Sequence, residues 1–513
     1  MRFLCIIAVL MGAASHAHAD AKFVFSNAKG PHAVGLRVVH QYDLTRSYRG
    51  PTDPVTGKPQ PIVPGRPIQT LVWYPAAKAG TAVRYMDYLR LSATEETFDK
   101  IPAQIDTDTD VFVKQRSSGL SAQEAAAATS RPMWASRDAV PAAGRFPVVI
   151  YAPSLNAPAY ENADLCEYLA SQGYVVIASP AMGPRSREMP TDVEGIETQA
   201  ADIAFLIGYA ATLPQADVER LAVAGFSFGG ISNVFAAAKD NRIDALVSFD
   251  GSVRFFPNLI AEAKYVTPAR LTAPLLLLTA KPELIEDFPL PGLDKSTSFI
   301  GKMKYADVHR VTMKQMVHMN FASLFVGFMS DAGFDEYSRE EVMQSYNWSA
   351  RYTLAFLDAY LKEDARGRAF LANTPATNGV PLHLLNVNTR RSEGEPPTRE
   401  ALAAELAKQG FDQMPKAYAA FKSRDPAFQI TETDLNGWGY NLLSRGDNKA
   451  AIAVLKQATV LYPTSGNAFD SLAEAYEIDK DKALAIENYK ASLALDPTNT
   501  NAVAHLKGLG VSP

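Results

Sequence analysis

The chain has 513 residues, of which 47% are hydrophobic and 20% are charged, and its formal net charge at pH 7 is −5. This length predicts two or more domains, and the composition is typical of a globular protein with a sizeable core. A slight acidic excess without any long basic run excludes the charge pattern expected of a nucleic-acid-binding protein.

The first residues have the pattern of an export signal. Arg2 precedes a short apolar run at residues 3–14, and Ala17-His18-Ala19 is a small-x-small cleavage pattern. We therefore expect a signal peptide at residues 1–19, a mature chain beginning at Asp20, and a periplasmic or secreted location. No later stretch is long enough to span a bilayer, so no integral membrane span is expected in the mature chain.

The chain has two cysteines, Cys5 and Cys166. Cleavage of the signal peptide leaves Cys166 alone, so an intramolecular disulfide is not expected. Cys166 lies in an amphipathic helical pattern and is predicted to be a buried small hydrophobic residue rather than a nucleophile.

Short apolar runs then alternate with helical patterns, which predicts a mostly parallel sheet with helices on both faces. The expected strands are at residues 34–42, 68–74, 146–151, 174–178, 221–224, 245–249, 275–279 and 308–314. The expected helices are at residues 160–172, 197–211, 231–238 and 344–361. The polar segment 81–143 has little strand signal and is predicted to pass over the surface or the active site.

Residues 225–230 read Gly-Phe-Ser-Phe-Gly-Gly and carry the clearest chemical signal. A G-x-S-x-G motif between a strand and a helix is typical of a nucleophile elbow, whose small flanking residues let strand and helix pass closely. Ser227 at the apex is therefore the predicted nucleophile. The N–H groups that follow it begin a helix and can face an oxyanion.

A serine hydroxyl needs a base to take its proton, and in this fold the acid and then the histidine follow the serine along the chain. His318 lies just after the strand expected at 308–314 and is the predicted base. His309 is the weaker alternative, because it begins that strand at a position where a side chain packs or faces solvent.

Two carboxylates are candidates for the acid. Asp250 directly follows the strand at 245–249 and precedes a glycine turn, where a sheet presents catalytic groups. Glu283 follows the next strand, 275–279, which is the more usual strand for the acid. Position does not decide between them, and turn or N-cap roles explain most carboxylates at strand ends.

The chain resembles the α/β-hydrolase superfamily and, more narrowly, the platelet-activating-factor acetylhydrolase and dienelactone-hydrolase-like serine esterases. The similar segments lie within residues 30–362 and are Val72-Trp73-Tyr74-Pro75, residues 225–230, Phe249-Asp250-Gly251 and Val317-His318-Met319-Asn320-Phe321. The resemblance implies that the acid follows the strand after the elbow helix, which selects Asp250 and leaves Glu283 in reserve.

The resemblance also implies an oxyanion hole made by two backbone N–H groups. The family has a His-Gly turn after the third strand, where this chain reads Ala152-Pro153-Ser154-Leu155-Asn156. Leu155 N–H falls at the matching place, and Phe228 N–H is the second donor. Ser154 replaces the family's glycine, a departure that bears on the geometry of the first donor.

The C-terminal tail repeats with a period of 34, and Pro463 and Pro497 end its two units. Small and large residues recur at matching offsets, namely Gly439, Ala451, Leu455 and Ala458 in the first unit and Ala473, Ala485, Tyr489 and Ser492 in the second. Residues 501–509 have the pattern of a cap helix, and residues 398–421 of a further helix pair. The tail resembles the tetratricopeptide repeats found behind secreted bacterial serine hydrolases, and we expect it either to bind a protein partner or to brace the enzyme.

The predicted organisation is thus a signal peptide at 1–19, an α/β-hydrolase catalytic domain at 20–372, a linker and helical connector at 373–430, and tetratricopeptide repeats at 431–513. The predicted function is hydrolysis of small-molecule or lipid-like carboxylic esters through an acyl-enzyme. The alternatives are a peptidase or amidase, an acyltransferase, or a catalytically silent periplasmic interaction protein. No metal-ligand pattern, P-loop or dinucleotide fingerprint occurs, so no cofactor is expected.

Overall fold

The structure is a computed structural model that describes residues 23–49, 52, 56–58, 65–281, 298–334 and 336–512. The signal peptide expected at 1–19, including Cys5, lies outside these described residues. The chain divides into two compact units, which meet in sequence between Gly394 and Glu395. No helix in the described ranges combines the length and the apolarity needed to cross a bilayer.

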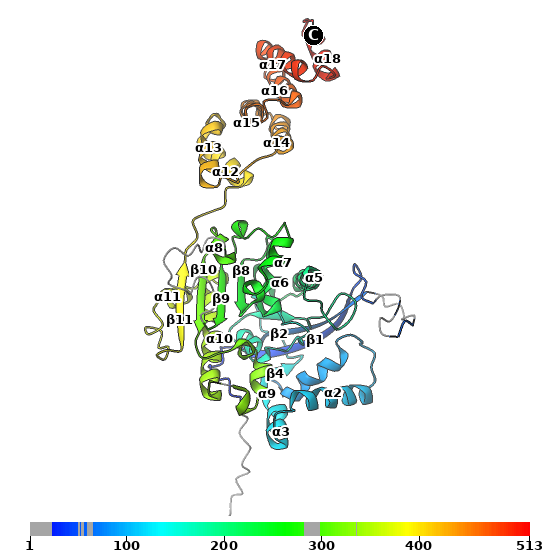
Figure 1. Ribbon diagram of the computed structural model, residues 1–513, viewed down its shortest axis with the longest axis vertical. Coiled ribbons are helices and arrows are strands. Elements are labelled where there is room, and N and C mark those ends of the chain that lie inside the picture. Colours follow the sequence, from blue (N-terminus) through cyan, green and yellow to red (C-terminus); the bar gives the residue numbers. More distant parts are fainter. Residues whose placement is uncertain are drawn as a thin grey trace, which may run out of the picture. The chain divides into compact units, whose positions relative to one another are not determined.

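The first unit is built around an 11-stranded mixed sheet with the order β11-β10-β9-β8-β7-β5-β6-β2-β1-β4-β3 (Figure 1). The strands are β1 (Ala33–Asp43), β2 (Arg66–Ala76), β3 (Ala82–Arg84), β4 (Pro132–Arg137), β5 (Phe146–Ala152), β6 (Val175–Ala178), β7 (Ala216–Phe226), β8 (Ala245–Phe249), β9 (Leu275–Ala280), β10 (Val308–Met313) and β11 (Leu385–Arg390). Six neighbouring strands pair in parallel, in the spatial order β6, β5, β7, β8, β9 and β10. β2 pairs antiparallel with β6 at one side of this block, and β11 pairs antiparallel with β10 at the other. All carboxyl ends of the parallel block therefore meet at one edge of the sheet.

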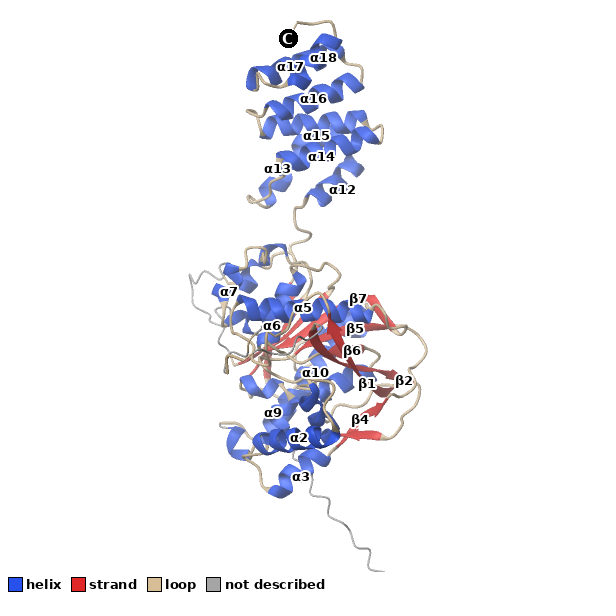
Figure 2. Ribbon diagram, turned by 90° about the vertical axis from the view of Figure 1, so that its right-hand side faces the viewer, coloured by secondary structure: helices blue, strands red, loops and turns tan. Residues whose placement is uncertain are grey.

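Helices pack on both faces of this sheet (Figure 2). The main ones are α4 (Ala163–Ser171) and α10 (Arg339–Leu361) on one face and α5 (Val193–Ala210) and α6 (Phe228–Ala237) on the other. In β5, Val149 contributes to the first core and Val148 and Ile150 to the second. A strand buried on both faces needs such a continuous apolar run, which explains why the sequence pattern located it.

The segment 81–143 differs from its prediction. It contains β3 and β4, which join the sheet beyond β1, and between them α1 (Tyr85–Leu89), α2 (Pro102–Arg116) and α3 (Ala122–Ser130). β4 reads Pro-Met-Trp-Ala-Ser-Arg and pairs in parallel with β1 over three residues. So short and mixed a strand has no periodicity that a sequence pattern can detect.

The predicted domain boundary at residue 372 is wrong. The first unit continues to Gly394, because β11 pairs antiparallel with β10 along its whole length. β11 reads Leu-Asn-Val-Asn-Thr-Arg, and a half-polar edge strand of this kind has the composition of a linker.

The segment 395–430 also belongs to a folded unit rather than to a connector. It forms α12 (Arg399–Gln409) and α13 (Met414–Arg424), whose apolar residues share one core with the helices that follow. The helix pair expected near residues 398–421 is therefore confirmed, as part of the second unit.

The second unit is a series of helical hairpins. It continues with α14 (Glu432–Ser444), α15 (Asn448–Leu461), α16 (Gly466–Ile478), α17 (Lys482–Leu495) and α18 (Thr500–Gly508). α14, α16 and α18 begin 34 residues apart, at 432, 466 and 500, which confirms the predicted period. The small residues lie where the helices touch, since a Cβ at Gly439 would overlap the side chain of Leu455. The identity of the units as tetratricopeptide repeats stays a prediction.

Candidate active site

Ser227 lies at the turn between β7 and α6, at the carboxyl edge of the sheet. Its φ of 53° and ψ of −114° are strained for a residue with a side chain. The flanking glycines permit this turn, because a Cβ at Gly225 would overlap the carbonyl of Gly229, and one at Gly229 would overlap the carbonyl oxygen of Ala152. Ser227 N–H also donates to the Phe249 carbonyl at 3.0 Å, which ties the apex to the neighbouring strand β8.

His318 begins the 3-10 turn His318–Phe321, which follows β10. Its Nε2 lies 2.8 Å from Ser227 Oγ, and its Nδ1 lies 2.6 Å from Asp250 Oδ2. Because a carboxylate only accepts hydrogen bonds, Nδ1 carries the proton and Nε2 is left to accept one from Ser227. The structure thus brings the three predicted residues together in one hydrogen-bonded chain.

Asp250 directly follows β8 and is fully buried. Besides His318, it accepts a hydrogen bond from Ala280 N–H at 2.8 Å, and it pairs with Arg254, whose Nη2 lies 3.0 Å from Oδ1. A carboxylate removed from water is costly unless it is paired and hydrogen-bonded. These contacts provide that compensation and hold the carboxylate against the imidazole.

The sequence left one alternative for the acid, Glu283, and one for the base, His309. Glu283 lies outside the described residues. His309 is 1% exposed, and its ring nitrogen atoms bond Thr389 Oγ1 at 3.1 Å and Tyr360 OH at 2.8 Å. Burial lowers the pKa of His309 to about 4, so this imidazole is a neutral structural group at neutral pH.

The two predicted oxyanion donors lie at the same end of the sheet. Leu155 belongs to the loop that leaves β5. The start of this loop passes close to the elbow, since a Cβ at Gly229 would overlap the carbonyl oxygen atoms of Ala152 and Pro153. Phe228 is the first residue of α6, where N–H groups have no partner within the helix. Among the described residues, neither amide donates a hydrogen bond to the protein, so both are free to bind an oxygen atom.

The structure adds two residues that the sequence analysis missed, Arg254 beside Asp250 and Glu161 beside Ser154. Glu161 Oε2 accepts a hydrogen bond from Ser154 N–H at 2.9 Å, and its other oxygen contacts the Ser154 hydroxyl. Burial raises the pKa of Glu161 to about 7, opposed by the hydrogen bonds from Ser154 and Tyr151. Neither residue belongs to a motif, and only its short sequence distance from a predicted site residue distinguishes it.

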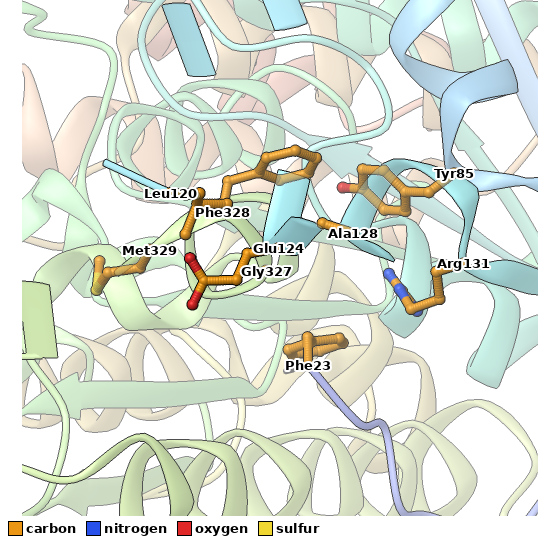
Figure 3. A pocket seen from close by; sticks show the side chains of 9 residues that line it. All are labelled: Phe23, Tyr85, Leu120, Glu124, Ala128, Arg131, Gly327, Phe328 and Met329. Atoms are coloured by element: carbon orange, nitrogen blue, oxygen red, sulfur yellow. The ribbon is translucent and has the colours of Figure 1, made fainter. Parts of the chain in front are cut away.

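Other features lie apart from the triad. The pocket drawn in Figure 3 is lined by Phe23, Tyr85, Arg131 and Phe328 among others, and its volume of about 10 Å³ is too small for a substrate. Cys166 is 1% exposed on α4, and burial raises the pKa of its thiol well above the ordinary value. Within the part of the chain that the structure describes, no cluster of three or more His, Cys, Asp or Glu residues is placed to hold a metal ion.

Comparisons with known proteins bear on this unit. Residues 135–283 match the model of the dienelactone hydrolase family, a segment that includes Ser227, Asp250 and Leu155 but not His318. Among solved structures, a ferulic acid esterase from Streptomyces cinnamoneus is 20% identical over 66% of this chain and 93% of that chain, with a TM-score of 0.46. A comparison with curated proteins found no match. The family match and the mixed, helix-covered sheet make the first unit α/β-hydrolase-like.

Proposed function

We propose that the protein is an exported serine hydrolase that cleaves carboxylic esters. The observation that carries this proposal is the hydrogen-bonded chain from Ser227 Oγ through His318 to Asp250, with distances of 2.8 and 2.6 Å. The match to the dienelactone hydrolase family supports an ester substrate, since the name of that family denotes a lactone, which is a cyclic ester.

In the first half of the proposed reaction, Ser227 Oγ attacks the carbonyl carbon of the ester while His318 Nε2 accepts the hydroxyl proton. The electron pair of the C=O π bond moves to oxygen, and the N–H groups of Leu155 and Phe228 bind the resulting oxyanion. When the tetrahedral intermediate collapses, the ester C–O bond breaks. His318 donates its proton to the leaving alcohol, and the acyl group stays on Ser227.

In the second half, a water molecule gives a proton to His318 Nε2 as its oxygen attacks the acyl carbon. The second tetrahedral intermediate breaks the bond to Ser227 Oγ, the carboxylic acid leaves, and Ser227 regains its proton from His318. Throughout, Asp250 holds the imidazole in the required tautomer and stabilises the imidazolium that forms in each half.

The decisive experiment combines a fluorophosphonate probe with hydrolysis of p-nitrophenyl esters. We expect the probe to label Ser227, and we expect Ser227→Ala to lose labelling and at least about 1,000-fold in kcat. A Ser227→Ala protein with full esterase activity would reject the assignment.

The same measurements decide between the alternatives. Faster cleavage of an amide than of the matched ester would indicate a peptidase or amidase, and transfer to an added alcohol in preference to water would indicate an acyltransferase. A correctly folded protein whose serine does not react would favour an interaction protein without catalysis.

Two further parts of the proposal rest on sequence. Export to the periplasm or the medium rests on the pattern of residues 1–19. A tetratricopeptide role for the second unit is supported by the 34-residue period of its hairpins, and such repeats present a groove for an extended peptide or a helix.

A further inference from the structure

The loop that supplies the first oxyanion donor is held by an unusual set of contacts at Ser154. This residue is 7% exposed, and both its backbone N–H and its hydroxyl are directed at the carboxyl group of Glu161. A glycine at position 154 would lack the hydroxyl contact.

Glu161 is held as firmly as the serine. Its side chain is fully buried, and Oε2 accepts hydrogen bonds from Ser154 N–H at 2.9 Å and from Tyr151 OH at 3.1 Å. Its own carbonyl oxygen accepts one from Leu324 N–H at 3.0 Å. The carboxyl group therefore lies between Tyr151 of β5 and Ser154 of the loop, while the bond from Leu324 holds the backbone of Glu161.

These contacts use the amide at position 154 and leave the next one unused. Leu155 N–H has no acceptor among the residues that the structure describes. We propose that Glu161 is the positioning residue of the oxyanion loop, which holds Ser154 inward so that Leu155 N–H faces the bound ester. This inference rests on the proposed function, because it assigns a role within the same reaction.

Three other contacts hold the loop by its carbonyl groups. Within the loop, Ala157 N–H donates to the Ser154 carbonyl at 3.0 Å. Gln199 Nε2 donates to the Pro153 carbonyl at 2.8 Å, and Arg187 Nη2 donates to the Asn156 carbonyl at 2.8 Å. Glu161 differs from these groups, because its carboxyl group contacts both the N–H and the hydroxyl of Ser154, the residue directly before Leu155. Without Glu161, the peptide unit that carries Leu155 N–H is held only at the Ser154 carbonyl, by Ala157 N–H, so we expect the direction of Leu155 N–H to be less well fixed.

Two substitutions of Glu161 have nearly equal size but differ in whether they can hydrogen-bond to Ser154. In Glu161→Gln, the carbonyl oxygen can take the place of Oε2 and the NH₂ group can donate to Ser154 Oγ. This variant resembles the protonated carboxyl group, which is accessible near neutral pH because burial raises the pKa of Glu161 to about 7. In Glu161→Leu, no atom can accept either hydrogen bond.

Glu167 provides the matched control. It lies on α4, further along the same segment, is 2% exposed, and accepts hydrogen bonds from Tyr88 OH at 2.7 Å and Trp134 N–H at 2.6 Å. Burial raises its pKa to about 7 as well. Glu167→Leu removes a comparable buried acceptor that does not contact the oxyanion loop.

The experiment measures kcat and KM for p-nitrophenyl acetate and hydrogen exchange of a peptide spanning residues 152–157, on the folded fraction of each full-length variant. Loss of an oxyanion donor lowers kcat by about 100- to 1,000-fold, so a displaced donor in Glu161→Leu is expected to lower it by about 10- to 100-fold with KM within about twofold. Exchange in the loop should accelerate in Glu161→Leu. Glu161→Gln should stay within about threefold of the wild-type kcat, and Glu167→Leu should keep kcat despite a lower Tm.

Unchanged kcat and unchanged loop exchange in Glu161→Leu would overturn the inference, and so would an equal loss of kcat in Glu167→Leu. If Glu161→Leu does not fold, Glu161→Met tests the same prediction with a more adaptable side chain. The proposed function fails separately: a wild-type protein that neither hydrolyses the ester nor reacts with a fluorophosphonate overturns both, whereas a reactive wild type with equally reactive Glu161→Leu overturns the positioning role alone.

Discussion

At the scale of single residues, the charge of Asp250 is the feature on which the site depends. This carboxylate has no exposure to solvent and lies between the imidazole of His318 and the guanidinium of Arg254, at 2.6 and 3.0 Å. The backbone N–H of Ala280 fixes its orientation. A side chain held this way can determine which nitrogen of the imidazole carries the proton.

Asp250→Asn tests this role. The carboxamide has nearly the same shape, but its NH₂ group can donate to the imidazole and stabilise the wrong tautomer. We expect kcat for a p-nitrophenyl ester to fall by about 10,000-fold at neutral pH with little change in KM. A loss of less than about tenfold would show that another group, such as Glu283, supplies the acid.

At the scale of elements, the elbow depends on how closely α6 passes the loop after β5. The close approach occurs at Gly229, where a Cβ would overlap the carbonyl oxygen of Ala152. Backbone cannot move aside as a flexible side chain can, so the loop that carries Leu155 would have to shift.

Gly229→Ala is therefore expected to lower the free energy of unfolding by about 1–3 kcal/mol and to reduce fluorophosphonate labelling of Ser227. The control is Gly208→Ala on α5, where an added Cβ meets no atom within 4 Å. A helical Gly→Ala change at an open position stabilises by up to about 1 kcal/mol, and labelling should be unchanged. Equal behaviour of the two variants in thermal unfolding and labelling would contradict the packing argument.

The sequence predicted the elements whose patterns are strong. Continuous apolar runs located β5, β8 and β9, and the glycine-flanked serine located the elbow. β4 and β11 were not predicted, because each is a short strand with polar residues whose stability comes from pairing with a neighbour. Glu161 was not identified for a related reason, because its contact with Ser154 is not encoded in any local sequence pattern.

At the scale of the whole molecule, the division after Gly394 places the residues of the candidate active site in one unit and the helical hairpins in the other. Ser227, Asp250, His318 and Leu155 all belong to the first unit. β11 belongs there too, since Leu384 and Leu385 are buried in the core that α10 covers and β11 forms the edge of the sheet beside β10.

Truncation tests this division. A chain that ends at Gly394 is expected to keep kcat within about twofold, because the site residues and the core that holds them are complete. A chain that ends at Ala372 lacks β11, so it exposes the edge of β10 and loses two buried leucines, each worth about 2 kcal/mol or more. It should aggregate or unfold at a lower temperature in a thermal scan, and a stable, active protein of that length would contradict the fold.

The buried carboxyl groups of the first unit predict its pH dependence. Burial raises the pKa of Glu95, Glu161 and Glu167 from 4.5 to about 7. The folded state thus holds protons that the unfolded state has released, so the contribution to stability is full below pH 4.5 and is lost as the pH rises through 7.

A pKa that is one pH unit higher in the folded than in the unfolded protein corresponds to about 1.4 kcal/mol, so a clearly lower Tm is expected at about pH 8.5 than at about pH 5.5. Glu167→Gln removes one of the three groups and should reduce the difference. A Tm that rises between these two pH values, measured by calorimetry at constant ionic strength, would show that these carboxyl groups are ionised without cost in the folded protein.

If the proposed function is right, Ser227 forms a covalent bond to the acyl group of an ester during turnover. Rapid acid quenching of the protein with excess p-nitrophenyl acetate, followed by peptide mass spectrometry, measures this directly. We predict a mass increase of one acetyl group on the peptide that contains Ser227, formed with a burst of one p-nitrophenol per chain and absent in Ser227→Ala. Steady release of p-nitrophenol without a burst and without acetylated Ser227 would contradict a mechanism through an acyl-enzyme at this residue.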